Sequence, residues 1–250
     1  MTNWSILPRR PFLAGNTRWL AGNTRWLAAA VVLPLVCLTA KAEDRAVTLI
    51  ATSAESPKEI AEPIRAVLQK SVLRLTDKDG PLLEFWFRQA LPLSQAPVPG
   101  RFVFEFETLP EGALIGVLRV HKERRDFRDE EIPPGVYTLR LGLQPEDGDH
   151  LGTSPTRYFA VLSPSKLDRK LKGISGHDHL ARISSKVNAA GHPSTMNLQP
   201  VRNKEGPFPR LAEHHQDHKL VYLQIPGRIE GQDKPVVLRF GIVYQGTGEI

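Results

Sequence analysis

Short runs in which apolar and polar residues alternate are the dominant pattern of this chain from Ala46 onward. In residues 101–107, Phe102, Phe104 and Phe106 fall on one side of an extended chain and the residues between them fall on the other. A period of two suits a strand with one face on a core and does not suit a helix. The runs predicted as strands are residues 46–52, 71–76, 82–87, 101–107, 114–121, 136–144, 157–163, 195–200, 219–225 and 236–244.

Turn-forming sequences separate these runs, among them DKDG at 77–80 and PPG at 133–135. Helical spacing is confined to two stretches: one in which a helix is predicted to begin at or near Pro63, and residues 179–187. Because these stretches do not alternate with strands, a parallel βαβ sheet is not expected. The sequence predicts an all-β fold: an antiparallel two-sheet sandwich, Ig-like or jelly-roll-like, with one or two short helices.

The start of the chain has the three parts of an export signal. Arg9 and Arg10 precede an uncharged run, residues 27–40. The small-residue pattern Ala40-Lys41-Ala42 stands at the end of this run. The run is shorter than the roughly 20 residues that span a bilayer. We therefore predict a signal peptide that is cleaved after Ala42 and a mature chain with no transmembrane segment.

The leader also indicates an export route. PRRPFLA at residues 8–14 resembles a twin-arginine signal peptide. The identical heptads AGNTRWL at 14–20 and 21–27 separate this motif from the apolar run, which is consistent with a tandem duplication that lengthened the leader. The alternative is the general export route for unfolded chains. Either route predicts a periplasmic or secreted protein.

Removing residues 1–42 changes the charge of the protein. The whole chain has 33 Lys and Arg against 27 Asp and Glu, and five of the basic residues lie in the leader. Subtracting these five leaves 28 basic against 27 acidic residues, so no nucleic-acid partner is predicted. The single cysteine, Cys37, is removed as well, which excludes a thiol nucleophile or a thiolate metal site from residues 43–250. We predict that 43–250 form one sandwich domain, with a loop-rich region at about 164–218.

Three segments resemble an uncharacterised family of exported, β-rich proteins of environmental Gram-negative bacteria. The segments are IPPGVYTLRLGLQPEDGDHLGTSPTRYFAVLSP at 132–164, IRAVLQKSVLRLTDKDGPLLEFWF at 64–87, and Gly191-His192-Pro193. The likeness extends over most of residues 57–246. It implies an exported β-rich fold and carries no assigned activity.

Histidines are concentrated late in the chain, with seven of the eight between His150 and His218. Imidazole is a common ligand of first-row divalent metals. On a strand His177 and His179 would share a face, and on a helix His214 and His218 would do so. These four are our candidate metal ligands. The alternative is that loop histidines bond to the backbone or face water.

No motif indicates a specific catalytic chemistry. GxSxG and HExxH are absent from the sequence, and the acidic DKDG and EDGDHLG stretches lack the closing Glu of a calcium loop. Glu84, Glu105 and Glu107 lie on predicted strands, where outward-facing acids are commoner than a glycosidase pair. We therefore interpret the protein as a non-catalytic binding or structural module of unknown ligand and partner. Alternatives are a metal-binding or metal-dependent periplasmic protein and a carbohydrate-associated domain.

Overall fold

A computed structural model describes residues 46–96, 105–146, 152–202, 206–214, 217–232 and 236–248. The predicted leader, with its paired arginines and its cleavage site, lies outside these residues, as does most of the EDGDHLG stretch. Within the described part of the chain, no helix is both long and apolar enough to cross a membrane.

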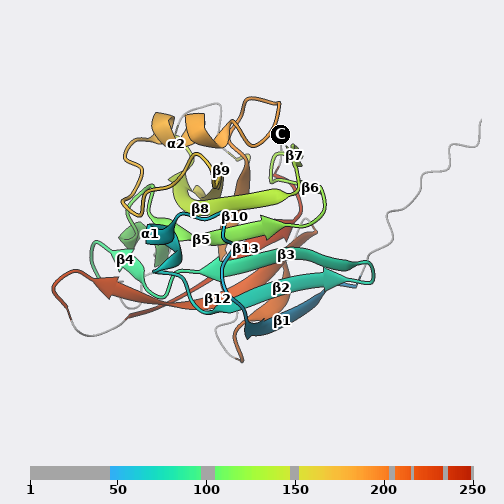
Figure 1. The fold of residues 1–250 in the computed structure, drawn as a ribbon, viewed down its shortest axis with the longest axis horizontal. Coiled ribbons are helices and arrows are strands. Elements are labelled where there is room, and N and C mark those ends of the chain that lie inside the picture. Colours follow the sequence, from blue (N-terminus) through green and yellow to red (C-terminus); the bar gives the residue numbers. More distant parts are fainter. Residues whose placement is uncertain are drawn as a thin grey trace, which may run out of the picture. The chain divides into compact units, whose positions relative to one another are not determined.

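Strands dominate the structure, and the predicted all-β class is confirmed (Figure 1). The elements in chain order are β1 (Thr48–Ser53), α1 (Glu62–Arg65), β2 (Ser71–Asp77), β3 (Gly80–Phe87), β4 (Leu91–Leu93), the 3₁₀ helix η1 (Glu105–Thr108), β5 (Leu114–Val120), β6 (Arg124–Arg125), β7 (Glu131–Ile132), β8 (Gly135–Leu143), β9 (Tyr158–Pro164), α2 (His177–Ser184), β10 (Thr195–Pro200), β11 (Arg210–His214), β12 (His218–Ile229) and β13 (Val236–Gln245). Except for β6 and β7, which pair with each other, these strands form one hydrogen-bonded sheet of 11 strands in the order β1-β2-β3-β5-β8-β9-β10-β13-β12-β11, with β4 alongside β12.

Strand β10 joins the two halves of this sheet. Its residues Thr195, Met196 and Asn197 pair with β9, whereas Leu198, Gln199 and Pro200 pair with β13. Hydrogen bonding therefore runs continuously through β10 from one half to the other.

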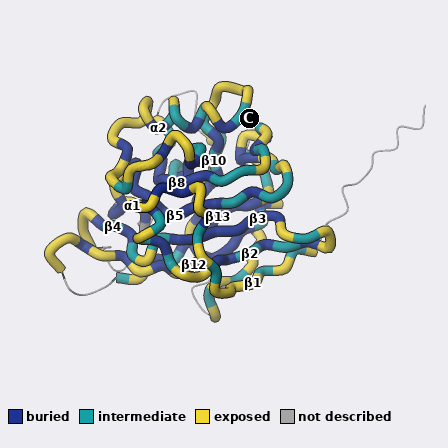
Figure 2. The backbone as a smooth tube through the Cα atoms, in the orientation of Figure 1, coloured by how far each residue is buried: buried dark blue, intermediate teal, exposed yellow. Residues whose placement is uncertain are grey.

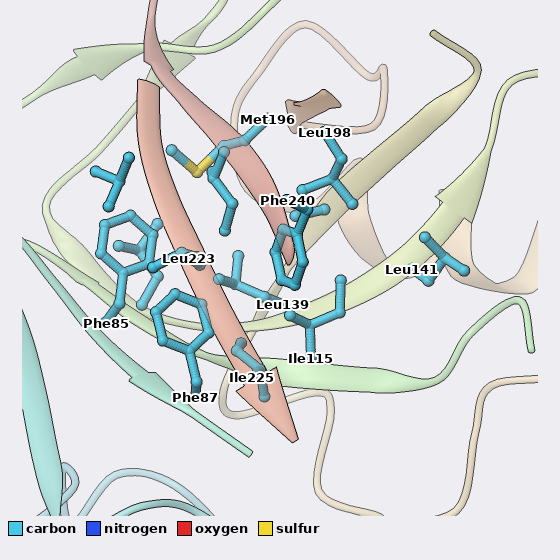
Figure 3. Packing of buried hydrophobic residues seen from close by; sticks show 14 of the residues in the cluster. Phe85, Phe87, Ile115, Leu139, Leu141, Met196, Leu198, Leu223, Ile225 and Phe240 are labelled. Atoms are coloured by element: carbon cyan, nitrogen blue, oxygen red, sulfur yellow. The ribbon is translucent and has the colours of Figure 1, made fainter. Parts of the chain in front are cut away.

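The main core is built from both halves of the sheet. Alternating side chains of β3, β5 and β8, among them Phe85, Ile115 and Leu139, lie in one buried cluster with Leu223 of β12 and Phe240 of β13 (Figure 3). Figure 2 shows the central strands as the buried part of the backbone, with β1 exposed at the edge. The strands predicted from the period of two thus supply much of this core.

The opposite face of β3, β5, β8 and β9 is covered by three smaller pieces of chain. Ile60 and Ile64 at α1 pack with Trp86 in a second buried cluster. Beside them Asp168, in the segment after β9, forms a buried ion pair with Arg140 of β8. Helix α2 lies over β8 and β9, and a third buried cluster contains its Leu180 (Figure 1).

The structure corrects several local predictions. Residues 105–107, predicted as strand, lie in the 3₁₀ helix η1, and residues 101–104 of that run are not described. Phe106 is nevertheless a core residue, because its ring packs edge-on against Phe240 with centroids 4.7 Å apart. The helix predicted at 179–187 spans 177–184 instead. Short strands β4, β6, β7 and β11 had no clear alternation and were missed.

Candidate ligand-binding cavity

A cavity of about 450 Å³ lies on the outer face of the sheet, beside α2. Its walls come from α2, the ends of β8 and β9, the start of β10, the turn after β6 and the stretch after β13. Cavities that hold small molecules are commonly about 300–1,000 Å³. Segments from six separate parts of the chain therefore meet around a space of the size that a small ligand needs.

The floor of the cavity is apolar. Phe159 and Val161 are two residues apart on β9 and so face the same side, toward Leu180 of α2. Gly142 of the neighbouring strand β8 pairs with Phe159, and a Cβ added there would stand only 2.4 Å from Cγ2 of Val161. Glycine at this strand position therefore leaves room for the side chain of Val161 on the floor of the cavity.

The rim of the cavity is polar and carries basic groups. Arg128, His177 and His192 all contribute to the lining. Arg128 is exposed, and its Nε lies 3.7 Å from Oε1 of Glu130, which makes a loose ion pair. The side chain of His177 is 46% exposed, and its Nδ1 lies 3.4 Å from Oε1 of Glu111. Both basic groups remain open to a ligand from the solvent side.

A buried carboxylate fixes the wall that carries Phe127 and Arg128. Oδ1 of Asp126 accepts hydrogen bonds from the backbone N–H groups of Arg128, at 2.8 Å, and Glu130, at 3.0 Å. Oδ2 accepts the N–H of Thr195 at 3.1 Å, which ties the turn to β10. Burial raises the pKa of Asp126, and these backbone hydrogen bonds partly offset the effect. The turn between β6 and β7 therefore has a buried anchor.

Directly behind Phe127 lies a buried polar network that contains two of the predicted metal ligands. The ring of His218 packs against Phe127 with centroids 5.2 Å apart. Its Nε2 lies 2.8 Å from the carbonyl oxygen of Thr247, and its Nδ1 lies 3.1 Å from Nε2 of Gln199. Oε1 of the same Gln199 lies 2.5 Å from Nδ1 of His214.

Hydrogen-bond chemistry assigns a direction to this network. The carbonyl of Thr247 can only accept, so His218 donates through Nε2–H, and Nδ1 of its neutral ring accepts from the amide of Gln199. The amide oxygen then accepts from Nδ1–H of His214, whose Nε2 accepts from the hydroxyl of Tyr222. Each ring nitrogen of both histidines thus has a hydrogen-bond partner, so binding a metal through either ring requires breaking one of these hydrogen bonds.

The four candidate metal ligands are placed in two different settings. His214 and His218 are directly paired across β11 and β12 and are 7% and 1% exposed. His177 and His179 lie in the first turn of α2, where both are exposed. No group of three or more His, Cys, Asp or Glu suited to a metal occurs among the residues that the structure describes, and His215 and His150 lie outside them. The metal hypothesis stays a prediction.

The carboxylate of Glu84, a candidate for sugar hydrolysis, is held by an ion pair with Arg74 and a hydrogen bond to His121. Its Oε1 lies 2.6 Å from Nη2 of Arg74, and its Oε2 lies 2.8 Å from Nε2 of His121. Burial opposes ionisation, but the hydrogen bonds from His121 and Arg74 outweigh it and lower the pKa of Glu84. Trp86, 3% exposed, donates its indole N–H to the carbonyl of Ala54. Trp86 is therefore a core residue and not an exposed platform for a sugar ring.

The cavity was not found from the sequence, although two of the segments quoted for the family resemblance contribute to it. Gly142 to Pro145 belong to the first of these segments, and His192 and Pro193 to another. About fifty residues separate the two, and the strand pairing of β8, β9 and β10 brings them together. Comparison of the chain with protein-family models, with curated proteins and with solved structures gives no match.

Proposed function

We propose that this protein is an exported, non-catalytic binding module that takes a small, mainly apolar organic molecule into the cavity beside α2. The observation that carries the proposal is the cavity itself: about 450 Å³, with an apolar floor and hydrogen-bonding groups gathered at the rim. Apolar walls with a few convergent polar groups are typical of small-molecule sites.

The way in which the cavity is held supports this role. Its Phe127 wall is anchored from both sides, because Asp126 binds the backbone of Thr195 and the N–H of Gly248 donates to the carbonyl of Phe127 at 2.8 Å. A site whose walls are fixed before binding loses less conformational freedom when a ligand enters. A rigid wall therefore favours affinity for a small molecule.

Two further features belong to the proposal. The leader, residues 1–42, directs the chain to the periplasm or the outside and is cleaved after Ala42. The large sheet is arranged as the two layers of a sandwich, with β10 shared between them. The single buried cluster that unites Phe85 and Leu139 with Leu223 and Phe240 supports that arrangement.

A neutral, environment-sensitive dye tests the binding function. Prodan, a naphthalene ketone without charge, should bind the purified chain at one site and shift its emission to the blue. Ala181→Trp places a large side chain into the cavity and should abolish this binding, whereas Arg182→Trp, at an exposed position of α2 outside the lining, should not. Circular dichroism checks that both variants fold. Equal dye binding by the wild type and Ala181→Trp would exclude the cavity as the site.

A further inference from the structure

The ionisable side chains among the described lining residues of the cavity are all basic. Among the described lining residues, Arg128 is a permanent cation, His177 and His192 carry imidazoles that gain positive charge on protonation, and none is Asp or Glu. An apolar cavity with cationic groups only at its mouth favours a ligand with one anionic end and an apolar body. This pattern of charge indicates the chemical class of the ligand, and the inference rests on the proposed function.

The guanidinium of Arg128 has donors to offer. The carboxylate nearest to it, that of Glu130, lies 3.7 Å from Nε, and no hydrogen bond from the guanidinium occurs among the described residues. A guanidinium binds a carboxylate through two parallel N–H groups, which leaves the two Nη groups of Arg128 suited to an incoming anion. Arg128 therefore lines the cavity and, within the part of the chain that the structure describes, has free N–H groups with which to bind an anion.

The first turn of α2 adds to the same preference. His177, Leu180 and Ala181 of this helix line the cavity, so its amino-terminal turn runs along the opening. The N-cap is Gly176, whose lack of a side chain leaves the first N–H groups without a side-chain cap. Uncapped N–H groups at a helix start attract negative charge. Asp178 in the same turn is exposed and does not contribute to the lining.

We propose that the ligand is a small organic carboxylate: an aromatic or branched hydrocarbon body that lies on Phe159, Val161 and Leu180, with one carboxylate at the rim held by Arg128 and approached by His177 and His192. A neutral molecule of the same shape fills the floor equally well but leaves the rim donors unused. An ammonium group in that place is repelled by Arg128.

Three probes of one shape test this inference: 4-phenylbutyrate, 4-phenylbutanol and 4-phenylbutylamine, each titrated into the purified chain by calorimetry at low salt. A single charge-assisted hydrogen bond contributes about 1.5–3 kcal/mol, or roughly tenfold or more in affinity. The carboxylate should therefore bind at least about tenfold more tightly than the alcohol, and the amine should bind most weakly. Raising the salt concentration should narrow these differences.

Variants locate the anion within the cavity. Arg128→Gln should lower the affinity for 4-phenylbutyrate roughly tenfold and leave that for 4-phenylbutanol unchanged. Arg125→Gln, at an exposed neighbour outside the lining, is the matched control and should change neither. His177→Gln should weaken carboxylate binding more than His179→Gln, because only His177 lines the cavity.

The outcomes separate the two proposals. If the alcohol and the carboxylate bind equally, and Ala181→Trp abolishes both, the cavity binds ligands without selecting anions, and the carboxylate inference is overturned alone. If Arg125→Gln and Arg128→Gln lower the affinity for 4-phenylbutyrate equally, the carboxylate inference is also overturned, because the loss of affinity would then come from the overall charge of the protein. If prodan and all three probes fail to bind, the proposed function fails.

Discussion

The buried ion pair of Arg140 and Asp168 leads to a specific prediction about stability. The side chain of Arg140 is 0% exposed, and Nε and Nη2 donate to the two carboxylate oxygens of Asp168 at 2.6 and 2.9 Å. The same guanidinium donates to the carbonyls of Gly112, at 2.8 Å, and Lys170, at 2.6 Å. The pair thereby fastens the segment after β9 onto the outer face of β8.

Arg140→Met should remove about 4 kcal/mol from the free energy of unfolding. The carboxylate of Asp168 would stay buried with only the hydroxyl of Thr138 to bond it, and breaking a buried pair in this way costs about 3–5 kcal/mol. The carbonyls of Gly112 and Lys170 would also lose their hydrogen bonds from the guanidinium. A single domain is commonly stable by only about 5–15 kcal/mol, so this one change takes a large part of the total.

Urea unfolding followed by circular dichroism measures the effect, and a double variant tests its cause. Arg140→Met with Asp168→Leu removes both charges and should cost only about 2 kcal/mol, less than either single change. The control is the exposed pair of Arg119 and Glu59, 33% and 53% exposed, where Arg119→Met should cost less than about 1 kcal/mol.

Two results would refute this reasoning. A loss below about 1 kcal/mol for Arg140→Met, no larger than that of the exposed control, would mean that the buried charge is not stabilised by its partner in the way described. A double variant less stable than both single variants would mean that the cost comes from lost packing volume and not from an unpaired charge.

The remaining predictions concern acid stability, the histidine network and export. Because the pKa of Glu84 is lowered in the folded protein, its carboxylate stabilises the fold above the ordinary pKa of 4.5, and this stabilisation is lost as the pH falls through the pKa of the folded state. Urea titrations should therefore show that the free energy of unfolding falls less steeply between pH 6 and 3 in Glu84→Gln than in the wild type. A variant as steep as the wild type would contradict this. Gln199→Leu leaves two buried imidazole nitrogens without their partner and should cost about 2–4 kcal/mol in the same assay, while a near-neutral result would mean that the network is not needed for stability. Arg9→Lys combined with Arg10→Lys should block twin-arginine export in cell fractionation, and unchanged export would indicate the general route.

Strand positions were predictable because alternation is a local property. Residues 195–200 were predicted as a strand and form β10 with the same bounds. The pattern failed at 105–107, where the chain buries Phe106 from a 3₁₀ helix instead. The ring of Phe106 can be buried in the core from a strand or from a 3₁₀ helix, so the sequence there did not distinguish the two conformations.

The histidine pairs show why the site could not be predicted from spacing. His214 and His218 were expected to share a helix face, but they are opposite each other across β11 and β12. His177 and His179, which would share a face on a strand, begin α2, where Gly176 at φ 89° turns the chain into the helix. In each case the secondary structure of a short polar stretch was decided by the segments packed on it.

The sequence by itself determined where the long strands of the sheet run, which side of them is apolar and where the turns between them fall, because these depend on neighbours within a few positions along the chain. It did not determine that β10 would pair with β9 by its first half and β13 by its second, or that the rim of the cavity would collect Arg128, His177 and His192 from three distant segments. Only the tertiary structure decided those contacts, because they depend on which strands pair and on the register in which they do so.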